Sequence, residues 1–116
     1  MNIKQITSII EDFAPLELQE SWDNSGFQIN FGVNEVNKIL LCLSVTENVI
    51  KQAEEGNFDL IIAHHPLFFI PFRFQRGITI YSAHTNLDVA KGGTTDTLIE
   101  VLGLNKPEIL EEWRWI

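Results

Sequence analysis

Two short motifs contain all three histidines of the sequence, and the second also contains an aspartate, so both carry side chains that can bind metal. The first, residues 64–66, reads HHP and directly follows the apolar run 60–63. The second, residues 84–88, reads HTNLD and directly follows the run 78–83. Imidazole and carboxylate groups at the ends of neighbouring buried strands are what a divalent metal site requires. Ligands bind at the carboxyl ends of parallel strands, so the two motifs predict a metal site there.

The candidate ligands are His64, His65, His84 and Asp88. Adjacent residues of a strand point to opposite faces, so His64 and His65 would share one ion only if the strand breaks between them. Pro66 favours such a break, because it restricts His65 and removes a backbone donor. The spacing favours two ions with a carboxylate such as Asp88 between them. Two ions about 3.5–4 Å apart activate one water and polarise a substrate oxygen.

Each of these residues also has a purely structural interpretation. A single histidine after an apolar run is usually a packed core or surface residue, and Asp88 fits a turn or a helix cap. Asp23 and Asn24 could orient a ligand or simply form a turn. The glycines at 92–93, directly before a predicted helix, could hold a phosphate on their amides, although a loop with a helix cap is favoured. Cys42 lies in an apolar run and is expected to be a buried core residue.

The elements that would position these side chains alternate between strands and helices. Isoleucines at three- and four-residue spacing predict the first helix, continuous apolar runs predict buried strands, and Thr46 is a plausible N-cap. A strand–helix–strand unit makes a parallel pair, so the fold class is α/β with a largely parallel sheet. Residues 1–116 are expected to form a single domain. The predicted helices are 2–13, 47–55 and 94–102, and the predicted strands are 38–44, 58–63 and 78–83.

Three further segments have weaker patterns. Residues 22–31 are expected to be irregular and then extended, with period two from Phe27. The segment 66–77 is rich in proline and phenylalanine and is expected to be a loop that packs on the domain or on a partner chain. The end of the sequence, 107–116, carries two tryptophans and is expected to be docked rather than free.

Composition limits the classes of function. Sixteen acidic against eight basic residues give a net charge of −8, which argues against binding to nucleic acid. No apolar run reaches the roughly 18 residues of a membrane span, so no membrane association is expected. The first residues lack a signal-peptide layout, which predicts a cytoplasmic protein. The single cysteine excludes a disulfide within the chain.

The same motifs resemble a known family. The stretches SWDNSGFQIN (21–30), DLIIAHHPLFF (59–69) and YSAHTNLDVAKGGTTDTLIEVLGL (81–104) are similar to those of the Nif-three-like dinuclear-metal-centre hexameric proteins, the GTP cyclohydrolase I type 2 homologues. The resemblance implies the N-terminal lobe of that α/β fold, a homo-oligomer that is a hexamer in the family, and a small-molecule ligand. It also implies one or two divalent ions per site, with zinc, iron and manganese all suited to imidazole and carboxylate.

By position, the resemblance assigns His64, His65 and Asp88 as metal ligands and His84 as a neighbouring acid–base or orienting group. It implies a metal-dependent hydrolase in which metal-activated water attacks a nucleotide or another small molecule. The alternatives are a metal-binding or oligomeric scaffold protein without turnover, and a degenerate copy with an incomplete site.

Three departures from the family bear on this choice. Full members are roughly twice as long, and their C-terminal half brings a further histidine and glutamate that have no counterpart here. Ser44 stands where the family usually has an aspartate. The connection between the HHP motif and the third strand, 67–77, is shorter than in the family. Two metal ions on three protein ligands would bind weakly unless a neighbouring chain completes the site.

Overall fold

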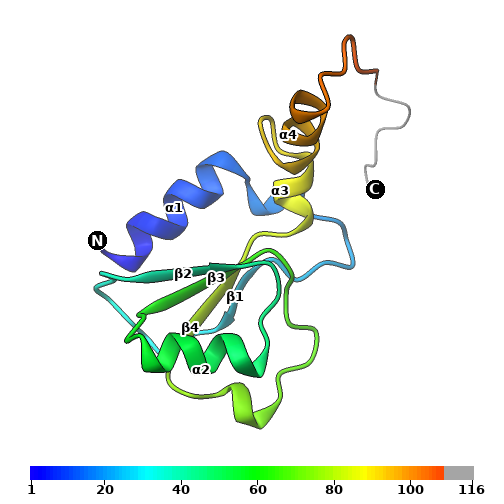
Figure 1. Cartoon of the computed structure of the whole chain (residues 1–116). Helices are drawn as coiled ribbons and strands as arrows, with labels where there is room; N and C mark the ends of the chain where they lie inside the picture. The colour runs from blue at the N-terminus through cyan, green and yellow to red at the C-terminus, as the bar shows by residue number, and fades with distance from the viewer. Residues whose placement is uncertain (109–116) are drawn as a thin grey trace.

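The computed structural model describes residues 1–108, which form a four-stranded sheet with helices on both faces (Figure 1). The predicted α/β class and the largely parallel sheet are confirmed. In chain order the helices and strands are α1 (Ile3–Phe13), β1 (Gly26–Ile29), β2 (Ile39–Cys42), α2 (Glu47–Glu55), β3 (Leu60–Ala63), β4 (Thr79–Ser82), α3 (Thr85–Val89) and α4 (Thr94–Val101). Two 3-10 turns, Leu16–Leu18 and Phe72–Phe74, lie in the connections.

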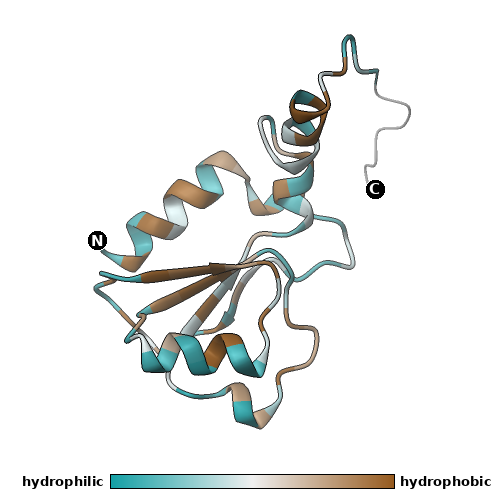
Figure 2. Cartoon of the chain, viewed as in Figure 1, coloured by the Kyte–Doolittle hydropathy of each residue, from teal (hydrophilic) through white to brown (hydrophobic). Residues whose placement is uncertain are grey.

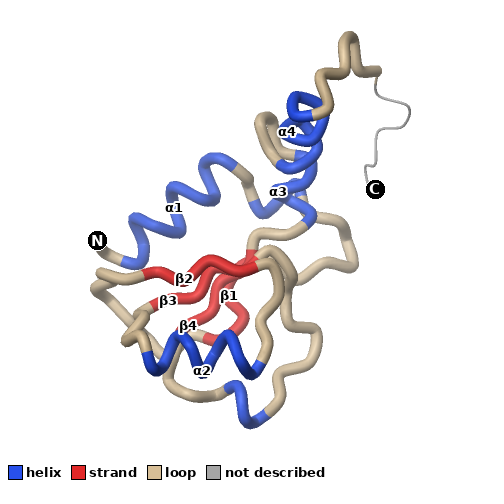
Figure 3. The backbone as a smooth tube through the Cα atoms, viewed as in Figure 1, coloured by secondary structure: helices blue, strands red, loops and turns tan. Residues whose placement is uncertain are grey.

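The strand order in the sheet is β1-β4-β3-β2 (Figure 3). Strands β2, β3 and β4 are parallel, and Leu40, Ile61 and Ile80 lie in register across them. Strand β1 runs antiparallel to β4 and closes the other side of the sheet. The carboxyl ends of the three parallel strands therefore meet at one edge, which is the arrangement that the two histidine motifs require.

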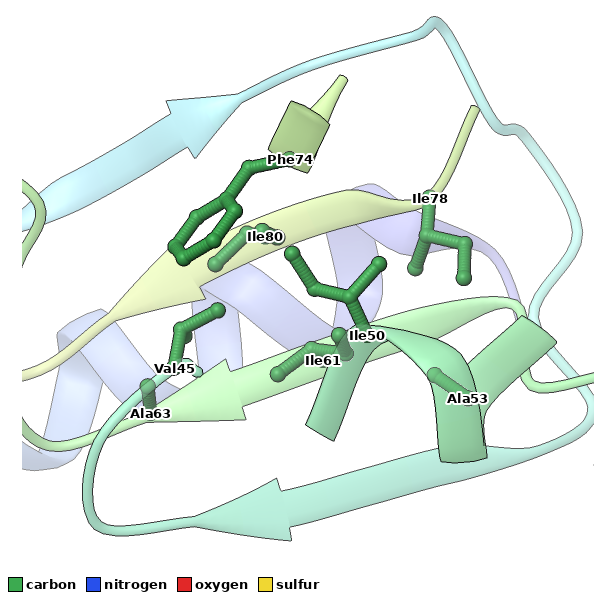
Figure 4. Close-up of a cluster of buried hydrophobic side chains, with 8 residues drawn as sticks. All are labelled: Val45, Ile50, Ala53, Ile61, Ala63, Phe74, Ile78 and Ile80. Atoms are coloured by element: carbon green, nitrogen blue, oxygen red, sulfur yellow. The ribbon is translucent and has the colours of Figure 1, made fainter. Parts of the chain in front are cut away.

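Helix α2 covers one face of the sheet, as the strand–helix–strand pattern predicted. It begins after Thr46, whose Oγ1 accepts a hydrogen bond of 3.2 Å from the amide of Val49. Ile50 and Ala53 of α2 are buried against the sheet. Figure 4 shows the resulting core between α2, β3, β4 and the second 3-10 turn: Val45, Ile50, Ala53, Ile61, Ala63, Phe74, Ile78 and Ile80.

Helix α1 covers the opposite face. Asn2 caps it with a capping box, and its buried isoleucines pack with Leu60 and Tyr81 of the sheet. The phenol of Tyr81, which is completely buried, donates a hydrogen bond of 2.7 Å to Oε1 of Glu11 on α1. Burial and this acidic partner raise the pKa of Tyr81 well above its usual value. The contact joins α1 to the middle of the sheet.

The prediction of a fully buried strand over 38–44 is wrong in its burial. Strand β2 is at the edge of the sheet, so its strongly apolar ribbon has a strand neighbour on one side only (Figure 2). Leu40 and Cys42 face the core under α2, whereas Leu41 and Leu43 are 74% and 64% exposed. A continuous apolar run identifies a strand in a parallel sheet, but it does not say whether a second strand follows it.

The connection from β3 to β4 is a loop with one 3-10 turn rather than a helix. Phe74 of this loop is buried in the core and Leu67 packs against it, whereas Phe68, Phe69 and Phe72 are exposed, so the expected packing on the domain holds for part of the loop. Helix α3 has five residues, too few for a periodic pattern, and was not predicted. The predicted docked tail falls mainly on residues 109–116, outside the described part of the chain.

Candidate metal centre

The three histidines meet at the carboxyl edge of the parallel strands. His64 and His65 directly follow β3, and His84 lies between β4 and α3, where it forms the N-cap of α3. One possible ligand atom from each ring lies within 4.8 Å of those of the other two. Histidine, cysteine, aspartate and glutamate are the side chains that usually bind metal. Among the described residues, these three histidines are the group of such side chains placed closely enough to hold an ion. The two histidine motifs therefore lie together at this edge of the sheet.

The strand break on which the pair depends is present. Strand β3 ends at Ala63. The amide of His64 then donates to the carbonyl of Cys42, the last residue of β2, and the amide of His65 donates to the carbonyl of Leu43, the next residue. Consecutive amides of a regular strand point to opposite sides, so this backbone is no longer a strand. The alternation that would separate the two side chains ends with it, and their ring centroids lie 5.3 Å apart.

Each imidazole has a protein partner at Nδ1. His64 Nδ1 lies 2.9 Å from Ala83 O, and His84 Nδ1 lies 3.0 Å from Oδ1 of Asp23. A carbonyl and a carboxylate only accept hydrogen bonds, so Nδ1 of both rings carries a proton, and Nε2 is the nitrogen through which each ring could bind a metal. His65 Nδ1 lies 2.7 Å from Ser44 Oγ, which donates or accepts. A histidine that binds a metal through one ring nitrogen usually has such a protein partner at its other ring nitrogen.

Asp23 is the residue that sequence reasoning left undecided. Its side chain has no exposed surface, and Oδ2 accepts hydrogen bonds from the amide and hydroxyl of Thr85 and from the hydroxyl of Ser25. Oδ1 accepts from His84 and from the amide of Asn24. Burial alone would raise the pKa of Asp23, but these hydrogen bonds outweigh it and lower the pKa to about 2. Asp23 is therefore ionised and points at His84.

The partnership of Asp23 and His84 had no local signal in the sequence. The two residues lie 61 positions apart, and the segment before β1 is irregular. The turn interpretation was correct for the backbone, since Asp23 N donates to Glu20 O and Asn24 N to the Asp23 side chain. Only the three-dimensional fold brings this turn to the carboxyl end of β4.

Asp88 lies beside one histidine rather than between two. Its Oδ1 is 3.3 Å from Nε2 of His64, and both side chains are partly exposed. Asp88 is on α3, one turn after His84, so the same short helix positions both residues of the HTNLD motif. The structure thus brings the predicted carboxylate to His64.

The donor set fits a divalent transition metal. Nitrogen ligands of one zinc-sized ion lie about 3.3 Å apart, so three imidazoles whose ligand atoms lie within 4.8 Å need only a small closure. Imidazole nitrogen with carboxylate oxygen is suited to zinc, iron and manganese. No lysine or arginine among the described residues forms an ion pair with Asp23 or Asp88, so no fixed cation competes for the two carboxylates.

Exposed aromatic rings border the histidines. Trp22 lies 6.1 Å from His84 and 6.4 Å from Phe68, measured between ring centroids. Both aromatic side chains are more than half exposed, and Phe69 and Phe72 further along the loop are more exposed still. We call Trp22, Phe68, Phe69 and Phe72 the aromatic surface.

Two alternative chemistries considered from the sequence have little structural support. The amides of Gly92 and Gly93 donate to Asp96 and to Ala90 O, and are thus not directed at a ligand. A Cβ at Gly93 would lie 2.0 Å from Leu87 O, so close packing of α3 explains this glycine. Burial raises the pKa of the Cys42 thiol, which disfavours a reactive thiolate.

Comparison with known proteins agrees with the motifs. A sequence profile of the family described as Duf34/NIF3 (NGG1p interacting factor 3) matches residues 1–76 and 72–113. A "GTP cyclohydrolase 1 type 2 homolog" of Clostridium perfringens is 42% identical over 127 aligned positions, which cover 97% of this chain and 48% of that protein. A homolog of the same name in Methanocaldococcus jannaschii is 36% identical, covering 95% of this chain and 51% of that protein.

Solved structures give the same result. The chain superposes on reduced HcgD from Methanocaldococcus jannaschii with a TM-score of 0.88 at 34% identity, covering 97% of this chain and 51% of that one. A Bacillus cereus protein related to NIF3 gives a TM-score of 0.84 at 38% identity, with 98% and 35% covered. The chain spans about half the length of the first curated relatives that it matches.

Proposed function

The chain belongs to the Duf34/NIF3 family, and we propose that it binds divalent metal at the carboxyl edge of its sheet. The observation that carries this proposal is the convergence of three imidazoles within 4.8 Å, each with a protein partner at Nδ1. A protein partner at one ring nitrogen orients the imidazole so that the other nitrogen can bind a metal ion.

The proposed ligands are His64, His65 and Asp88, as the family resemblance implied, and the proposed metals are zinc, iron or manganese. A bound ion would supply a Lewis acid that activates water and polarises a substrate oxygen. His84 lies beside this group, with Asp23 at its Nδ1, where it would act as an acid–base or orienting group. The corresponding activity is hydrolysis of a nucleotide or another small molecule, in line with the name "GTP cyclohydrolase 1 type 2 homolog" of the relatives.

A second candidate function is metal binding without turnover. It is favoured by the position of Asp88, which lies beside His64 alone and so does not bridge two ions between the histidines. Such a protein would act as a metal-binding scaffold. The third interpretation, a degenerate copy that has lost its site, is disfavoured by the intact hydrogen bonds at all three histidines.

Self-association into a homo-oligomer is part of the proposal. Trp22 lies next to His84 and Phe68, and Phe69 and Phe72 of the same loop are also exposed; exposed apolar patches usually mark an interface. A second copy seated there would lie over the partly open side of the site, where it could supply the ligands that the C-terminal half supplies in the family. A hexamer is the state that the family resemblance implies.

Metal analysis of the purified protein tests the proposed binding. Cells are grown with zinc, iron and manganese, and the metal content of the intact chain is compared with that of His64→Ala/His65→Ala. We expect at least one ion per wild-type chain and close to none in the double variant. Fewer than about 0.3 ions per wild-type chain would contradict metal binding by this site.

Turnover separates the enzyme from the scaffold. The metal-loaded oligomer is incubated with a panel of nucleoside triphosphates and monophosphates, and the release of phosphate, base and formate is followed. The proposed hydrolase gives turnover that disappears after chelation and returns when metal is added back. Absence of turnover in protein with full metal occupancy would support the scaffold.

A further inference from the structure

The side-chain amide of Gln28 fastens two segments of the chain to each other. Gln28 lies on β1, and its Oε1 accepts a hydrogen bond of 2.6 Å from the amide of Leu67, in the loop after the HHP motif. Its Nε2 donates to the carbonyl oxygens of Asn24 and Gly26, at 2.6 Å and 3.1 Å. Asn24 Nδ2 in turn donates to Gln28 Oε1 and to Leu67 O. Both oxygen lone pairs and both protons of the Gln28 amide are therefore used.

Each fastened segment carries an exposed aromatic ring. Trp22 lies two residues before Asn24, and Phe68 directly follows Leu67. The two ring centroids are 6.4 Å apart with 42° between the planes, although the residues are 57% and 65% exposed. The ring of Trp22 also lies 6.1 Å from that of His84, in an edge-on arrangement. Two aromatic faces are thus held open to solvent beside the histidine cluster.

We propose that Trp22 and Phe68 form a stacking platform for a flat conjugated ring of the substrate, and that Gln28 is the positioning residue that holds the two rings in place. The inference rests on the proposed function, because the ring belongs to the molecule on which the metal site would act. It narrows the substrate class from small molecules in general to compounds with a planar aromatic ring, such as a nucleobase or a pyridine carboxamide.

The distances between the rings determine where such a substrate lies. The centroids of interacting aromatic pairs are about 4.5–7 Å apart, so Trp22 and Phe68 are in contact and leave no space for a third ring between them. The substrate ring lies on their exposed faces, and Trp22 places it next to His84. Phe69 and Phe72 lie further along the loop and are not part of the platform.

Gln28 lowers the entropic cost of forming this platform. A substrate that must order a mobile loop on binding loses affinity by the free energy of that ordering. Because Leu67 is fastened to a regular strand through Gln28, the ring of Phe68 is in place beside Trp22 before a ligand arrives.

Ligands with flat and saturated rings provide the first test. Calorimetric titration measures the binding of adenosine, uridine and dihydrouridine to the full chain, with and without added zinc. Dihydrouridine keeps the sugar of uridine, but its ring is neither flat nor fully conjugated, so we expect affinity to fall in the order given. Nicotinamide and cyclohexanecarboxamide give the same comparison for a ring that is not a nucleobase. Equal affinity within both flat and saturated pairs, or no binding of any flat ring, would overturn the inference.

Alanine substitutions locate the platform. Removing one stacked ring weakens binding of a base about 5- to 150-fold, so Trp22→Ala and Phe68→Ala should each lower the affinity for adenosine within this range. Phe31→Ala is the matched control. Phe31 is 48% exposed as well, but its amide donates to Thr79 at the start of β4, whereas His84 follows the end of that strand. Unchanged affinity in both ring variants, or an equal loss in the control, would overturn the platform.

A variant of the remaining aromatic surface separates stacking from assembly. Phe69→Ser/Phe72→Ser removes two exposed rings that the platform does not use. It should keep the wild-type affinity for adenosine even where light scattering shows that the oligomer has dissociated. A loss as large as that of Trp22→Ala would show that the rings act through assembly and would overturn the platform.

The positioning role of Gln28 needs a readout that a general loss of stability does not change. Trp113→Phe/Trp115→Phe leaves Trp22 as the single tryptophan of the chain, so its emission reports the surroundings of this ring. In this background Gln28→Ala should change the emission of the folded protein and weaken adenosine binding. Unchanged emission and unchanged affinity would remove the positioning role.

A double-mutant comparison shows whether Gln28 acts through the rings. Gln28→Ala should weaken adenosine binding by a smaller factor in the Trp22→Ala background than in wild type, whereas a purely structural role would give the same factor in both. Asn30→Ala is the matched control, because the Asn30 side chain accepts from the amide of Gly32 within its own segment. It should change neither the emission nor the affinity.

The metal content of the same preparations separates this inference from the proposed function. Wild-type protein that binds metal but does not distinguish flat from saturated rings keeps the metal site and overturns the platform alone. Protein that distinguishes the rings but holds no metal removes the proposed metal-dependent function and leaves the platform as a binding site.

Discussion

At the scale of single residues, the partner of each imidazole determines what the imidazole can do. Ala83 O and the Asp23 carboxylate fix the proton of His64 and His84 at Nδ1, whereas Ser44 leaves the tautomer of His65 open. Ser44, which stands where the family resemblance places an aspartate, gives His65 an uncharged partner, whereas His84 has the charged partner Asp23. Residue type alone did not distinguish these three environments, because each partner comes from a different segment of the chain.

The low pKa of Asp23 makes the stability of the metal-free protein depend on acid pH. Its folded-state pKa of about 2 lies below the ordinary value of 3.8, so its contribution is fully present above about pH 4 and is lost as the pH falls toward 2. The shift corresponds to about 2 kcal/mol. Urea unfolding between pH 5 and pH 2 should show this loss in wild type and a flatter profile in Asp23→Asn. Parallel profiles for the two proteins would contradict the assignment.

At the scale of elements, one polar pair adds to the apolar packing of α1 on the sheet. Tyr81→Phe removes the hydroxyl that donates a hydrogen bond of 2.7 Å to Glu11, and it leaves the buried ring in place. A hydrogen bond to a charged group contributes about 1.5–3 kcal/mol, so we expect the free energy of unfolding to fall by about that amount. Glu11→Gln, which retains an acceptor oxygen, should cost less. Thermal and urea unfolding measure both, and equal losses would show that the charge of Glu11 contributes nothing.

The junction between α3 and α4 needs a residue without a side chain at position 93, where the sequence has glycine. In Gly93→Ala the new Cβ would lie 2.0 Å from Leu87 O and 2.8 Å from Ala90 O, both backbone atoms that cannot swing away. We expect a loss of at least about 2 kcal/mol, because the last turn of α3 must move. Gly32→Ala is the control: its φ of 77° disfavours alanine, but no atom lies within 4 Å of the new Cβ, so the cost should be about 1 kcal/mol. Circular dichroism melts compare the two, and similar losses would show that close packing is not the cause.

Most elements could be predicted because their signals are local. The isoleucine spacing of α1 and the Thr46 cap of α2 each depend on residues within a few positions of one another. Helix α3 could not be found, because five residues show no period, and the exposure of β2 could not be found, because edge position is a property of the whole sheet. The location of the candidate site could be predicted because both histidine motifs follow strands that were expected to be parallel, and the carboxyl ends of parallel strands lie at one edge of the sheet. The role of Asp23 depends on a contact across 61 positions, which no local pattern contains.

At the scale of the whole molecule, metal binding should stabilise the fold. His64 and His65 follow β3, whereas His84 and Asp88 lie after β4, so an ion bound by them joins two strands and α3. At a free Zn²⁺ concentration 100 times the dissociation constant, the gain is about 2.7 kcal/mol, or about 10 °C in Tm. Mg²⁺, which prefers oxygen ligands, should give no shift, and neither should Zn²⁺ with His64→Ala/His65→Ala. A Tm that is the same with and without Zn²⁺ would contradict a specific site.

The aromatic surface links assembly to the number of bound ions. His64, His65 and Asp88 suffice for one ion, whereas a second ion needs further ligands, which residues 1–108 do not provide outside the histidine cluster. Phe69 and Phe72 are 80% and 89% exposed, so Phe69→Ser/Phe72→Ser removes apolar surface without disturbing the core. We expect the wild-type protein to be an oligomer with two ions per chain and the variant to be a monomer with one.

Light scattering coupled to gel filtration gives the mass, and metal analysis of the same fractions gives the stoichiometry. Leu98→Ser is the matched control, because Leu98 on α4 is also exposed but lies outside the aromatic surface, and it should leave both quantities unchanged. A monomeric variant without metal would mean that the first ion also depends on the partner copy. An oligomer that survives the double substitution would place the interface elsewhere, with the exposed leucines of β2 as the next surface to test.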